Sequence, residues 1–366
     1  MKFEVSKEDI VKAVGIVEKI AGRHMTLPVL QCVYIEAVGR ILTLRATNLE
    51  LGIEVSLPAR IEGEGKVAVP APTLHSVLLS AYGTQKIVFE GDGGNLTIVT
   101  PTSSTVLKTL PPEDFPMLPR LEASLKFSMR ASDFIKGVKA VWYCASISTV
   151  KPELSSVYIN HEAEKLIFVA TDSFRLAEKA VPLKHIANFE PILIPFRNIP
   201  EIVRILEGVE GEIEIGVTQN QIAFTANNLY LSSRLVNGSF PDYKQIIPKD
   251  ADTKATLLKQ DFAQVLKKVQ IFSDKSNQVH FAVVPQKKRF VVSARNDEVG
   301  ETEDAIEATL SGNDVEINFN HRYITDCFQS IASDSIEISL SGLQKPMVLR
   351  GVSDASFLYI AMPMNK

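Results

Sequence analysis

The sequence consists of three copies of one pattern, and this repeat constrains the fold more than any other feature. The segment KFEVSKEDIVKAVGIVEKIA at 2–21 returns as KFSMRASDFIKGVKAVWYCA at 126–145 and, more loosely, as ATLLKQDFAQVLKKVQIFS from Ala255. A later shared segment is marked by alanines that lie 124 residues apart, at Ala46, Ala170 and Ala294. Since each copy of such a repeat corresponds to one structural unit, we expect three domains of one plan. We place copies one, two and three at 1–120, 121–249 and 250–366.

The same order of elements is predicted within each copy. A short strand runs into an amphipathic helix, further strands follow, and a second strand runs into a second helix at 67–82, 192–207 and 317–332. Apolar and polar residues then alternate with period two, which is typical of antiparallel hairpins, at 86–100, 212–226 and 335–351. The predicted fold class is therefore α+β, with two helices per copy packed on antiparallel sheets. Because no Gly-, Pro- or Ser-rich linker separates the copies, we expect them to pack end to end.

The helices are predicted to be amphipathic, with an apolar stripe facing the sheets and basic residues on the other side. In the helix expected at 7–21 the stripe is Ile10, Val14, Val17 and Ala21, opposite Lys12 and Lys19, and in the helix expected at 131–145 it is Phe134, Val138 and Val141, opposite Lys136 and Lys139. In the helix expected at 260–272 the stripe is Phe262, Val265 and Val269, opposite Lys267 and Lys268. In the second helix of copy two it is Ile202, Val203 and Leu206, opposite Arg197 and Arg204.

The charge of the chain is distributed unevenly. Five helix-bearing segments together contain 13 Lys or Arg against 9 Asp or Glu: 7–23, 131–146, 197–207, 259–275 and 321–332. The whole chain, in contrast, has a net charge of −4. A net negative chain is unsuited to wrapping nucleic acid on a basic surface, so any contact with DNA should be local or topological. Either these charges are merely solvated, or the helices form a mildly basic face near phosphates. The candidates for such a face are Arg23, Lys136, Lys139, Arg197, Arg204 and Lys267.

Motifs for catalysis, metal binding or membrane insertion are missing from the sequence. GEGK at 63–66 lacks the first Gly and the hydroxyl residue of a phosphate-binding loop, and GDGG at 91–94 is expected to be a hairpin turn. Asp172 corresponds to Asn48 and Asn296 in the other copies, which indicates a turn former rather than a catalytic acid. No run approaches the ~20 apolar residues that span a bilayer, and the N-terminus does not resemble a signal peptide. We therefore expect a cytoplasmic protein that has no cofactor and no enzymatic activity.

Three cysteines, Cys32, Cys144 and Cys327, are far apart and embedded in apolar segments. The six histidines never adopt an H-E-x-x-H spacing and never sit beside a Cys pair. We expect the cysteines to be reduced residues of the core, and we expect no metal site.

Four segments resemble the bacterial DNA sliding clamps, the beta subunits of the replicative DNA polymerase III holoenzyme. They are ATDSFRLA at 170–177, SFPDY at 239–243, MPM at 362–364 and GRHMTLPVL at 22–30, and the resemblance extends over the whole chain. It implies a homodimer joined head to tail into a ring, with helices lining the hole. Such a ring encircles double-stranded DNA without reading its sequence, and it tethers DNA polymerases and the clamp loader, which bind it through short linear motifs.

The resemblance also implies site residues. A pocket between copies two and three would bind a short peptide that contains a Gln and large apolar residues. Carried over residue by residue, this pocket consists of Leu154, Thr171, Phe174, Arg175, Leu176, Pro241, Ile246, Asn320, Tyr323, Met362, Pro363 and Met364. The chain departs from other clamps at Ser173, Phe174, Gln245, Asn365 and Lys366, and these departures put the preferred peptide motif in doubt.

The dimer contact implied by the resemblance joins Leu107 of one protomer to Ile271 and Phe272 of its partner, although the latter two could simply end a core helix. Two other classes of function remain open. A repeat-built scaffold that binds proteins without encircling DNA would show the same repeats. A DNA-processing enzyme would need clustered carboxylates or metal ligands, which the sequence does not display.

Overall fold

The computed structural model describes residues 1–22, 27–118, 120–123, 125–184 and 189–364, and the chain divides into two compact units. Unit 1 contains Met1–Ser132 and Arg197–Leu235, and unit 2 contains Asp133–Phe196 and Val236–Lys366. Copy two therefore contributes to both units. The reason is strand pairing, since one of its strands pairs with copy one and another pairs with copy three.

Unit 1 contains two antiparallel sheets. The five-stranded sheet has the order β5 (Arg60–Gly63), β1 (Lys2–Ser6), β7 (Lys86–Gly91), β8 (Asn95–Val99), β9 (Ser104–Lys108). The eight-stranded sheet has the order β10 (Leu125–Arg130), β15 (Glu212–Val217), β16 (Gln221–Ala226), β17 (Leu229–Arg234), β4 (Leu51–Pro58), β3 (Ile41–Thr47), β2 (Cys32–Val38), β6 (Gly65–Pro70). Copies one and two share this sheet because β17 pairs with β4, with Leu229 opposite Val55.

Unit 2 repeats this plan. Its nine-stranded sheet has the order β14 (Ile192–Pro195), β11 (Ser156–Glu162), β12 (Lys165–Thr171), β13 (Arg175–Pro182), β26 (Asp354–Ala361), β25 (Met347–Gly351), β24 (Ser335–Leu340), β18 (Thr253–Leu258), β22 (Ala308–Gly312). Its four-stranded sheet has the order β21 (Gly300–Ile306), β20 (Arg289–Asn296), β19 (Gln278–Val284), β23 (Val315–Asn320). Here β13 of copy two pairs with β26 of copy three.

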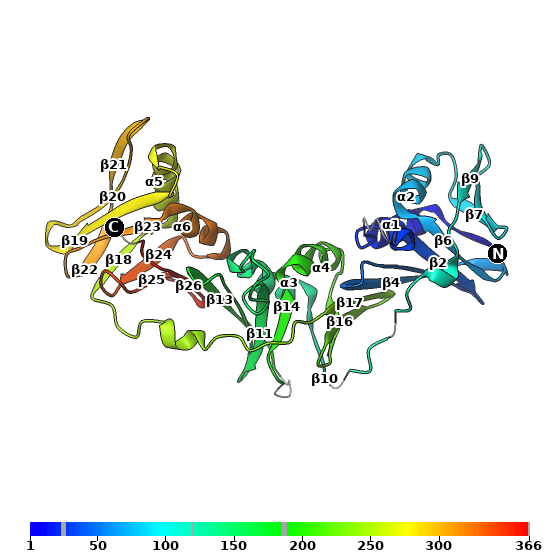
Figure 1. Cartoon of the computed structure of the whole chain (residues 1–366), viewed down its shortest axis with the longest axis horizontal. Helices are drawn as coiled ribbons and strands as arrows, with labels where there is room; N and C mark the ends of the chain where they lie inside the picture. The colour runs from blue at the N-terminus through cyan, green and yellow to red at the C-terminus, as the bar shows by residue number, and fades with distance from the viewer. Residues whose placement is uncertain (23–26, 119, 124, 185–188, 365–366) are drawn as a thin grey trace. The chain divides into compact units, whose positions relative to one another are not determined.

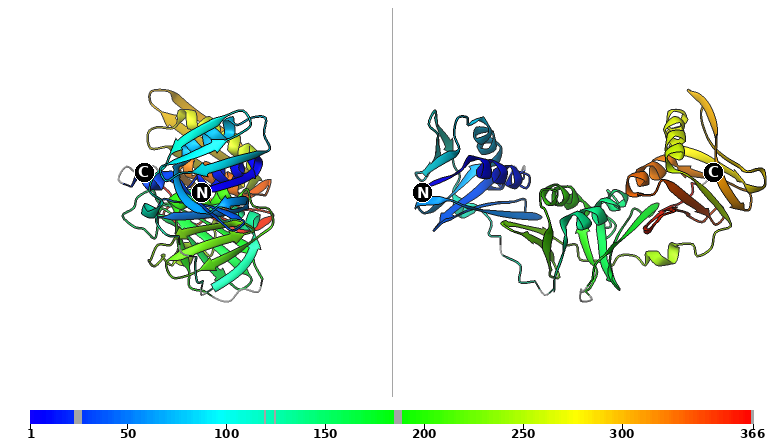
Figure 2. Two further views of the ribbon diagram at one scale, coloured as in Figure 1. Left: turned by 90° about the vertical axis from the view of Figure 1, so that its right-hand side faces the viewer. Right: turned by 180° about the vertical axis from the view of Figure 1, so that it is seen from behind.

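Six α-helices are described, two in each copy, as predicted. They are α1 (Lys7–Val17), α2 (Ala71–Ser80), α3 (Ala131–Lys139), α4 (Ile199–Leu206), α5 (Lys259–Phe272) and α6 (His321–Cys327). Figures 1 and 2 show α1 and α2 side by side against the part of the eight-stranded sheet that belongs to copy one. In unit 2, α5 contacts α6 and strands β20 and β21. The predicted hairpins β7–β8, β15–β16 and β24–β25 are confirmed.

Helix α1 ends four residues earlier than predicted. The Ser6 hydroxyl accepts the N–H of Asp9 and caps its start, and Ile10, Val14 and Val17 are buried as expected. After Val17 the backbone tightens, and the N–H of Ile20 donates to the carbonyl of Val17 at 3.1 Å. This i→i+3 spacing turns Ile20 into the core, at 1% exposed, and leaves Ala21 half-buried. The prediction that Ala21 closes the stripe was wrong.

Two further helices also differ from the prediction. Helix α3 stops at Lys139 and is followed by the 3-10 turn η3 (Trp142–Cys144), although Phe134, Val138 and Val141 are all buried as predicted. In α5 the prediction of Val265 was wrong, because Leu266 is 1% exposed in its place and Val265 is half-buried. Leu266 rather than Val265 faces the core because the ring of Phe262 packs against the rings of Phe281, Phe290 and Phe328 and so fixes the orientation of α5. The apolar stripe of α4 is confirmed by the burial of Ile202, Val203 and Leu206.

The cysteines are free and buried, as the sequence indicated. Burial raises the pKa of the Cys32 thiol to about 11, so it stays protonated at neutral pH. Among the described residues, no group of three or more His, Cys, Asp or Glu side chains is placed to hold a metal ion. Every helix in the described part of the chain is too short or too polar to cross a bilayer.

Candidate functional site

The turn between β12 and β13 is closed by hydrogen bonds from its own side chains and presents one exposed aromatic side chain. The Thr171 hydroxyl donates to the carbonyl of Arg175 at 2.7 Å, and Asp172 Oδ1 accepts the N–H groups of Phe174 and Arg175, both at 2.9 Å. Ser173 adopts a left-handed conformation with φ of 78°. These bonds hold Phe174 at the tip of the turn, where its side chain is 60% exposed. The prediction that Asp172 forms a turn is confirmed.

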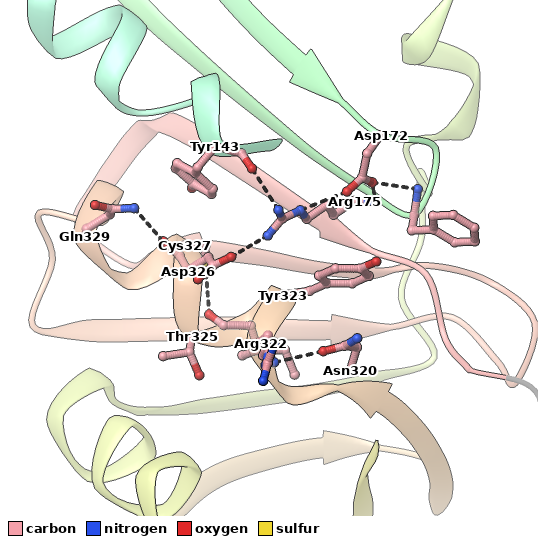
Figure 3. A network of polar contacts seen from close by, with 12 residues as sticks. Tyr143, Asp172, Arg175, Asn320, Arg322, Tyr323, Thr325, Asp326, Cys327 and Gln329 are labelled. Carbon is pink, nitrogen blue, oxygen red and sulfur yellow. Dashed lines mark hydrogen bonds and ion pairs between the residues drawn. The ribbon is translucent and has the colours of Figure 1, made fainter. Parts of the chain in front are cut away.

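Arg175 lies at the centre of a polar network (Figure 3). Its Nε–H donates to Asp172 Oδ2 at 3.0 Å, Nη1 donates to Asp326 Oδ2 at 2.5 Å, and Nη2 donates to the carbonyl of Tyr143 at 2.8 Å. The Tyr323 ring lies 4.7 Å from the guanidinium carbon. Burial by itself would lower the pKa of Arg175, but the acidic groups around it raise that pKa above its ordinary value. The guanidinium therefore stays charged and ties β13 to α6 and to η3.

Helix α6 places Tyr323 against this network. Asn320 caps the helix, since its side-chain oxygen accepts the N–H of Arg322 at 3.0 Å. The carbonyl of Tyr323 accepts the hydroxyl of Tyr359 at 2.6 Å, which anchors the helix to the sheet. Burial, followed by the Asp172 charge, raises the pKa of Tyr323, so its hydroxyl is neutral at physiological pH.

The segment after β26 runs beside the same turn. Within the sheet, β26 pairs with β13, with Ala361 opposite Arg175 and Ile360 opposite Leu176. The N–H of Met362 then donates to the carbonyl of Phe174, and the N–H of Met364 donates to the carbonyl of Asn318, both at 2.8 Å. Met362, Pro363 and Met364 are all half-buried. Residues of copy two and residues of copy three thus meet at the end of β13.

The remaining predicted pocket residues lie on another side of β13. Leu176 packs with Tyr243 in an apolar cluster, and the Tyr243 hydroxyl donates to Glu178 at 2.5 Å. Tyr243 starts the 3-10 turn η5 (Tyr243–Ile246), which ends at the exposed Ile246, and the exposed Pro241 lies two residues before the turn. Since neighbouring strand residues point to opposite faces, Arg175 and Leu176 serve the two faces of the sheet. Leu154 is buried and is bonded through its carbonyl to the N–H of Ser146, at 2.8 Å.

The sequence could not identify the partners of Arg175. Asp326 lies 151 residues further along the chain, and Tyr143 contributes a backbone carbonyl, which any residue could supply. Tyr359 was missed for a similar reason, because it alternates within an apolar strand like its neighbours. Gln245 pairs with Asp242 at 2.8 Å, while Asn365 and Lys366 lie outside the described residues.

The basic candidates are found on the surface of their helices. Lys136, Lys139, Arg197, Arg204 and Lys267 are exposed, and Arg23 lies outside the described residues. In unit 1, Lys19, two residues after the end of α1, donates to the carbonyl of Arg204 of α4 at 3.4 Å, so the end of α1 lies close to α4. Burial, followed by the Arg204 charge, lowers the pKa of Lys19. Lys268 was predicted to share the basic face, but it forms an ion pair with Asp304 at 2.9 Å.

The predicted interface residues lie at the edges of their units. Leu107 belongs to β9, the outermost strand of the five-stranded sheet, but its side chain is 7% exposed. Its neighbour Val106, which no sequence pattern singles out, is 58% exposed. Ile271, at the end of α5, is 63% exposed, and Phe272 is half-buried. An exposed edge strand offers backbone N–H and C=O groups to another chain.

The chain matches three family models in succession: the N-terminal, central and C-terminal domains of the DNA polymerase III beta subunit, at residues 1–119, 128–242 and 244–365. It is 28% identical to the beta sliding clamp of Caulobacter vibrioides, with 100% of both chains covered. The crystal structure of the DNA polymerase III subunit beta from Pseudomonas aeruginosa superposes with a TM-score of 0.95 at 25% identity, again over 100% of both chains. A sliding clamp from Bartonella birtlesii, solved bound to griselimycin, gives a TM-score of 0.92 at 28% identity and covers 100% of both chains.

Proposed function

The chain belongs to the DNA polymerase III beta subunit family, the bacterial sliding clamps, and from this we propose that it is a ring-forming processivity factor without catalytic activity. The observation that carries this proposal is the match of all three beta subunit domains, in order, over nearly the whole chain. The ring encircles duplex DNA without sequence preference and tethers polymerases and the clamp loader. Its place of action is the bacterial chromosome and hence the cytoplasm.

Within this proposal the chain functions as three domains at 1–120, 121–249 and 250–366. Two protomers join head to tail, since a contact between two different surfaces closes into a ring when the rotation permits. The edge strand β9 supports this proposal, because pairing with domain three of the partner would cover its exposed backbone. Leu107 contributes through its backbone, while Ile271 and Phe272 supply apolar contact.

The decisive experiment measures retention on DNA. The protein is loaded onto nicked circular plasmid with its cognate loader and ATP, the complex is isolated at high salt, and the plasmid is then linearised. We expect retention on circles and loss after cutting, because high salt weakens ionic binding but not a topological link. Absence from circles, with a loader verified on another clamp, would favour the protein-binding scaffold instead.

The proposed interface is tested separately. The double variant Ile271→Ala and Phe272→Ala should shift the dimer to monomer at nanomolar concentration, measured by analytical ultracentrifugation with fluorescence detection. The matched control, Leu343→Ala, removes another exposed apolar side chain, 63% exposed, in the same unit. A double variant that stays dimeric would exclude this interface.

We also propose that Phe174, Tyr323, Met362 and the residues around them form the binding site for partner peptides. Met and Leu side chains accept differing apolar anchors, and a few polar groups orient the peptide. Phe174→Ala combined with Met364→Ala should weaken binding of a peptide made of Gln, Leu and Phe roughly tenfold or more. Because the Bartonella birtlesii clamp was solved bound to griselimycin, griselimycin should bind this chain and compete with the peptide. Binding that is unchanged in the double variant would place the peptide elsewhere.

A further inference from the structure

Unit 1 contains a cavity of about 400 Å³ that the proposed function does not use. It lies where copies one and two meet, between α1, β4, the turn from β16 to β17 and the loop after α4 (Figure 1). Its floor is apolar and includes the buried side chains of Val55, Ala226 and Leu229. Its rim carries the exposed charged residues Asp9, Lys12 and Glu210. A concave site with an apolar floor and a few polar groups is typical of sites for small ligands.

Unit 2 fills the corresponding place with one of its own lysines. Val55 of β4 and Lys179 of β13 lie 124 residues apart, at equivalent positions of the two strand pairs that join neighbouring copies. The Lys179 ammonium donates to Asp354 Oδ2 at 3.0 Å and to the Ser356 hydroxyl at 2.6 Å, and the side chain is 2% exposed. The repeated fold thus accommodates, at this place, an alkyl chain that ends in an ammonium group.

The residues that hold this lysine are replaced in unit 1. In the same register, Ala226 and Asn228 stand where unit 2 has Asp354 and Ser356. Valine and alanine are smaller than lysine and aspartate, so the space that the ion pair fills in unit 2 is open in unit 1. The Asn228 amide donates to the carbonyl of Ser56 at 2.9 Å, which leaves its side-chain oxygen to act as an acceptor at the cavity.

The charges at the rim favour a cationic ligand. Among the described residues, the ionisable groups that line the cavity are Asp9, Lys12 and Glu210. Two negative charges and one positive charge give the rim a net charge of −1. Arg204 and Glu207, near the end of α4, do not line the cavity, and their charges offset each other. A ligand with one positive charge would neutralise the rim, whereas an anion would be repelled.

We propose that this cavity is a binding site for a small aliphatic amine. The alkyl chain lies on the floor at Val55 and Leu229, and the ammonium faces Asp9, Glu210 and the Asn228 side-chain oxygen. The ligand occupies the place that Lys179 fills in unit 2. Because copies one and two both line the cavity, a bound amine stabilises the contact between them. The site is separate from the proposed peptide site, which lies in unit 2.

Three small molecules test the preference for a cation on the full-length protein. Hexylamine, hexanol and hexanoate share a six-carbon chain and differ in charge, and their affinities are measured by saturation-transfer NMR. The wild type should bind hexylamine roughly threefold more tightly than hexanol and roughly tenfold more tightly than hexanoate. Hexanoate binding as tight as hexylamine binding would overturn the charge argument, and an absence of hexylamine binding would overturn the site.

Variants of the floor test the location of the ligand. Val55→Met extends an apolar side chain into the cavity, and Val55→Lys combined with Ala226→Asp rebuilds the ion pair of unit 2. Both should abolish hexylamine binding, provided that circular dichroism shows a folded protein. Hexylamine binding that persists in a folded Val55→Met variant would place the ligand elsewhere and overturn the inference.

Variants of the rim leave the core intact and decide the matter if the floor variants do not fold. Asp9→Asn combined with Glu210→Gln should bring the affinities for hexylamine and hexanol to within about twofold, because only Lys12 stays charged. The matched control, Asp114→Asn combined with Glu122→Gln, changes the net charge equally at exposed residues of unit 1 that do not line the cavity, and it should leave the preference unchanged. An equal loss of preference in both double variants would show that overall charge, and not this cavity, selects the amine.

Discussion

Gly137 of α3 lies so close to the ring of Phe168 that a larger side chain would not fit there. A Cβ added there would lie 2.3 Å from Phe168 Cε2, and Phe168 is fully buried. Gly→Ala in a helix normally gains stability, but here the rigid ring must move, and overpacking of this kind costs about 1–3 kcal/mol. Gly137→Ala should therefore lower the urea midpoint of unfolding. Gly94→Ala is the control, because a Cβ there meets nothing within 4 Å, and an equal loss in both variants would refute the packing argument.

Lys179 and Asp354 form an ion pair between β13 and β26, with Nζ 3.0 Å from Oδ2 and Lys179 2% exposed. Burial alone would raise the pKa of Asp354, but hydrogen bonds from Ser356 and Lys179 lower it below its ordinary value. Because the pKa of Asp354 is lower in the folded state than in the unfolded state, its carboxylate stabilises the folded protein above about pH 4, and this contribution is lost as the pH falls further.

Lys179→Met leaves this carboxylate buried without its cation. The variant should lose about 3 kcal/mol at pH 7, and it should lose less below pH 4, where protonation removes the unpaired charge. Urea unfolding midpoints at pH 7 and pH 3.5 measure the difference, and Lys254→Met, at an exposed ion pair, serves as the control. A loss that is the same at both pH values would contradict the charge argument.

Sequence patterns locate buried residues to within about one position. The stripes at Phe134, Val138 and Val141 follow from helical periodicity alone. Val265 and Leu266 are equally apolar neighbours, and the aromatic cluster around Phe262, assembled from distant strands, decides which of them is buried. Such choices belong to tertiary packing, which local periodicity does not encode.

At the scale of elements, the same turn recurs in all three copies, at Asn48, Asp172 and Asn296, but its contacts with the rest of the chain differ. Asn48 Oδ1 accepts the N–H groups of Glu50 and Leu51 at 3.0 and 2.7 Å, as Asp172 does in copy two, and Asn296 Oδ1 accepts the N–H of Glu298 at 2.9 Å. The sequence predicted this correspondence because the residues align at the repeat period. It could not predict that the turn of copy two is also tied to α6, since Asp326 becomes its neighbour only after folding.

The variants Asn48→Ala and Asp172→Ala separate the role of this residue in closing the turn from its role in connecting the turn to α6. Each variant removes two local hydrogen bonds and should cost about 1–2 kcal/mol. Only Asp172→Ala removes a partner of Arg175, so it alone should also weaken binding of the Gln-, Leu- and Phe-containing peptide, measured by calorimetry. Equal peptide affinity in the two variants would show that the Arg175 network does not support the site.

At the scale of the molecule, the repeat predicts the α+β plan, and the copies are joined by continuous sheets. The pairs β4–β17 and β13–β26 each connect two copies with ordinary antiparallel register. These pairings were not predictable from the sequence, because an edge strand can pair with any strand of suitable register. They explain why copy two divides between two units rather than folding as a body of its own.

The distribution of charge over the whole molecule leads to the last prediction. Lys136, Lys139 and Lys267 are exposed on helices, and a ring that slides needs phosphate contacts that are present but weak. Reversing all three to Glu should reduce loader-dependent retention on nicked circles roughly tenfold, since lost cation–phosphate contacts lower affinity and added carboxylates repel the duplex. The matched control reverses Lys165, Lys287 and Lys345, which are exposed outside the α-helices and change the net charge equally. If both triple variants load equally well, or lose retention equally, the helices carry no special contact with DNA, and overall charge alone governs loading.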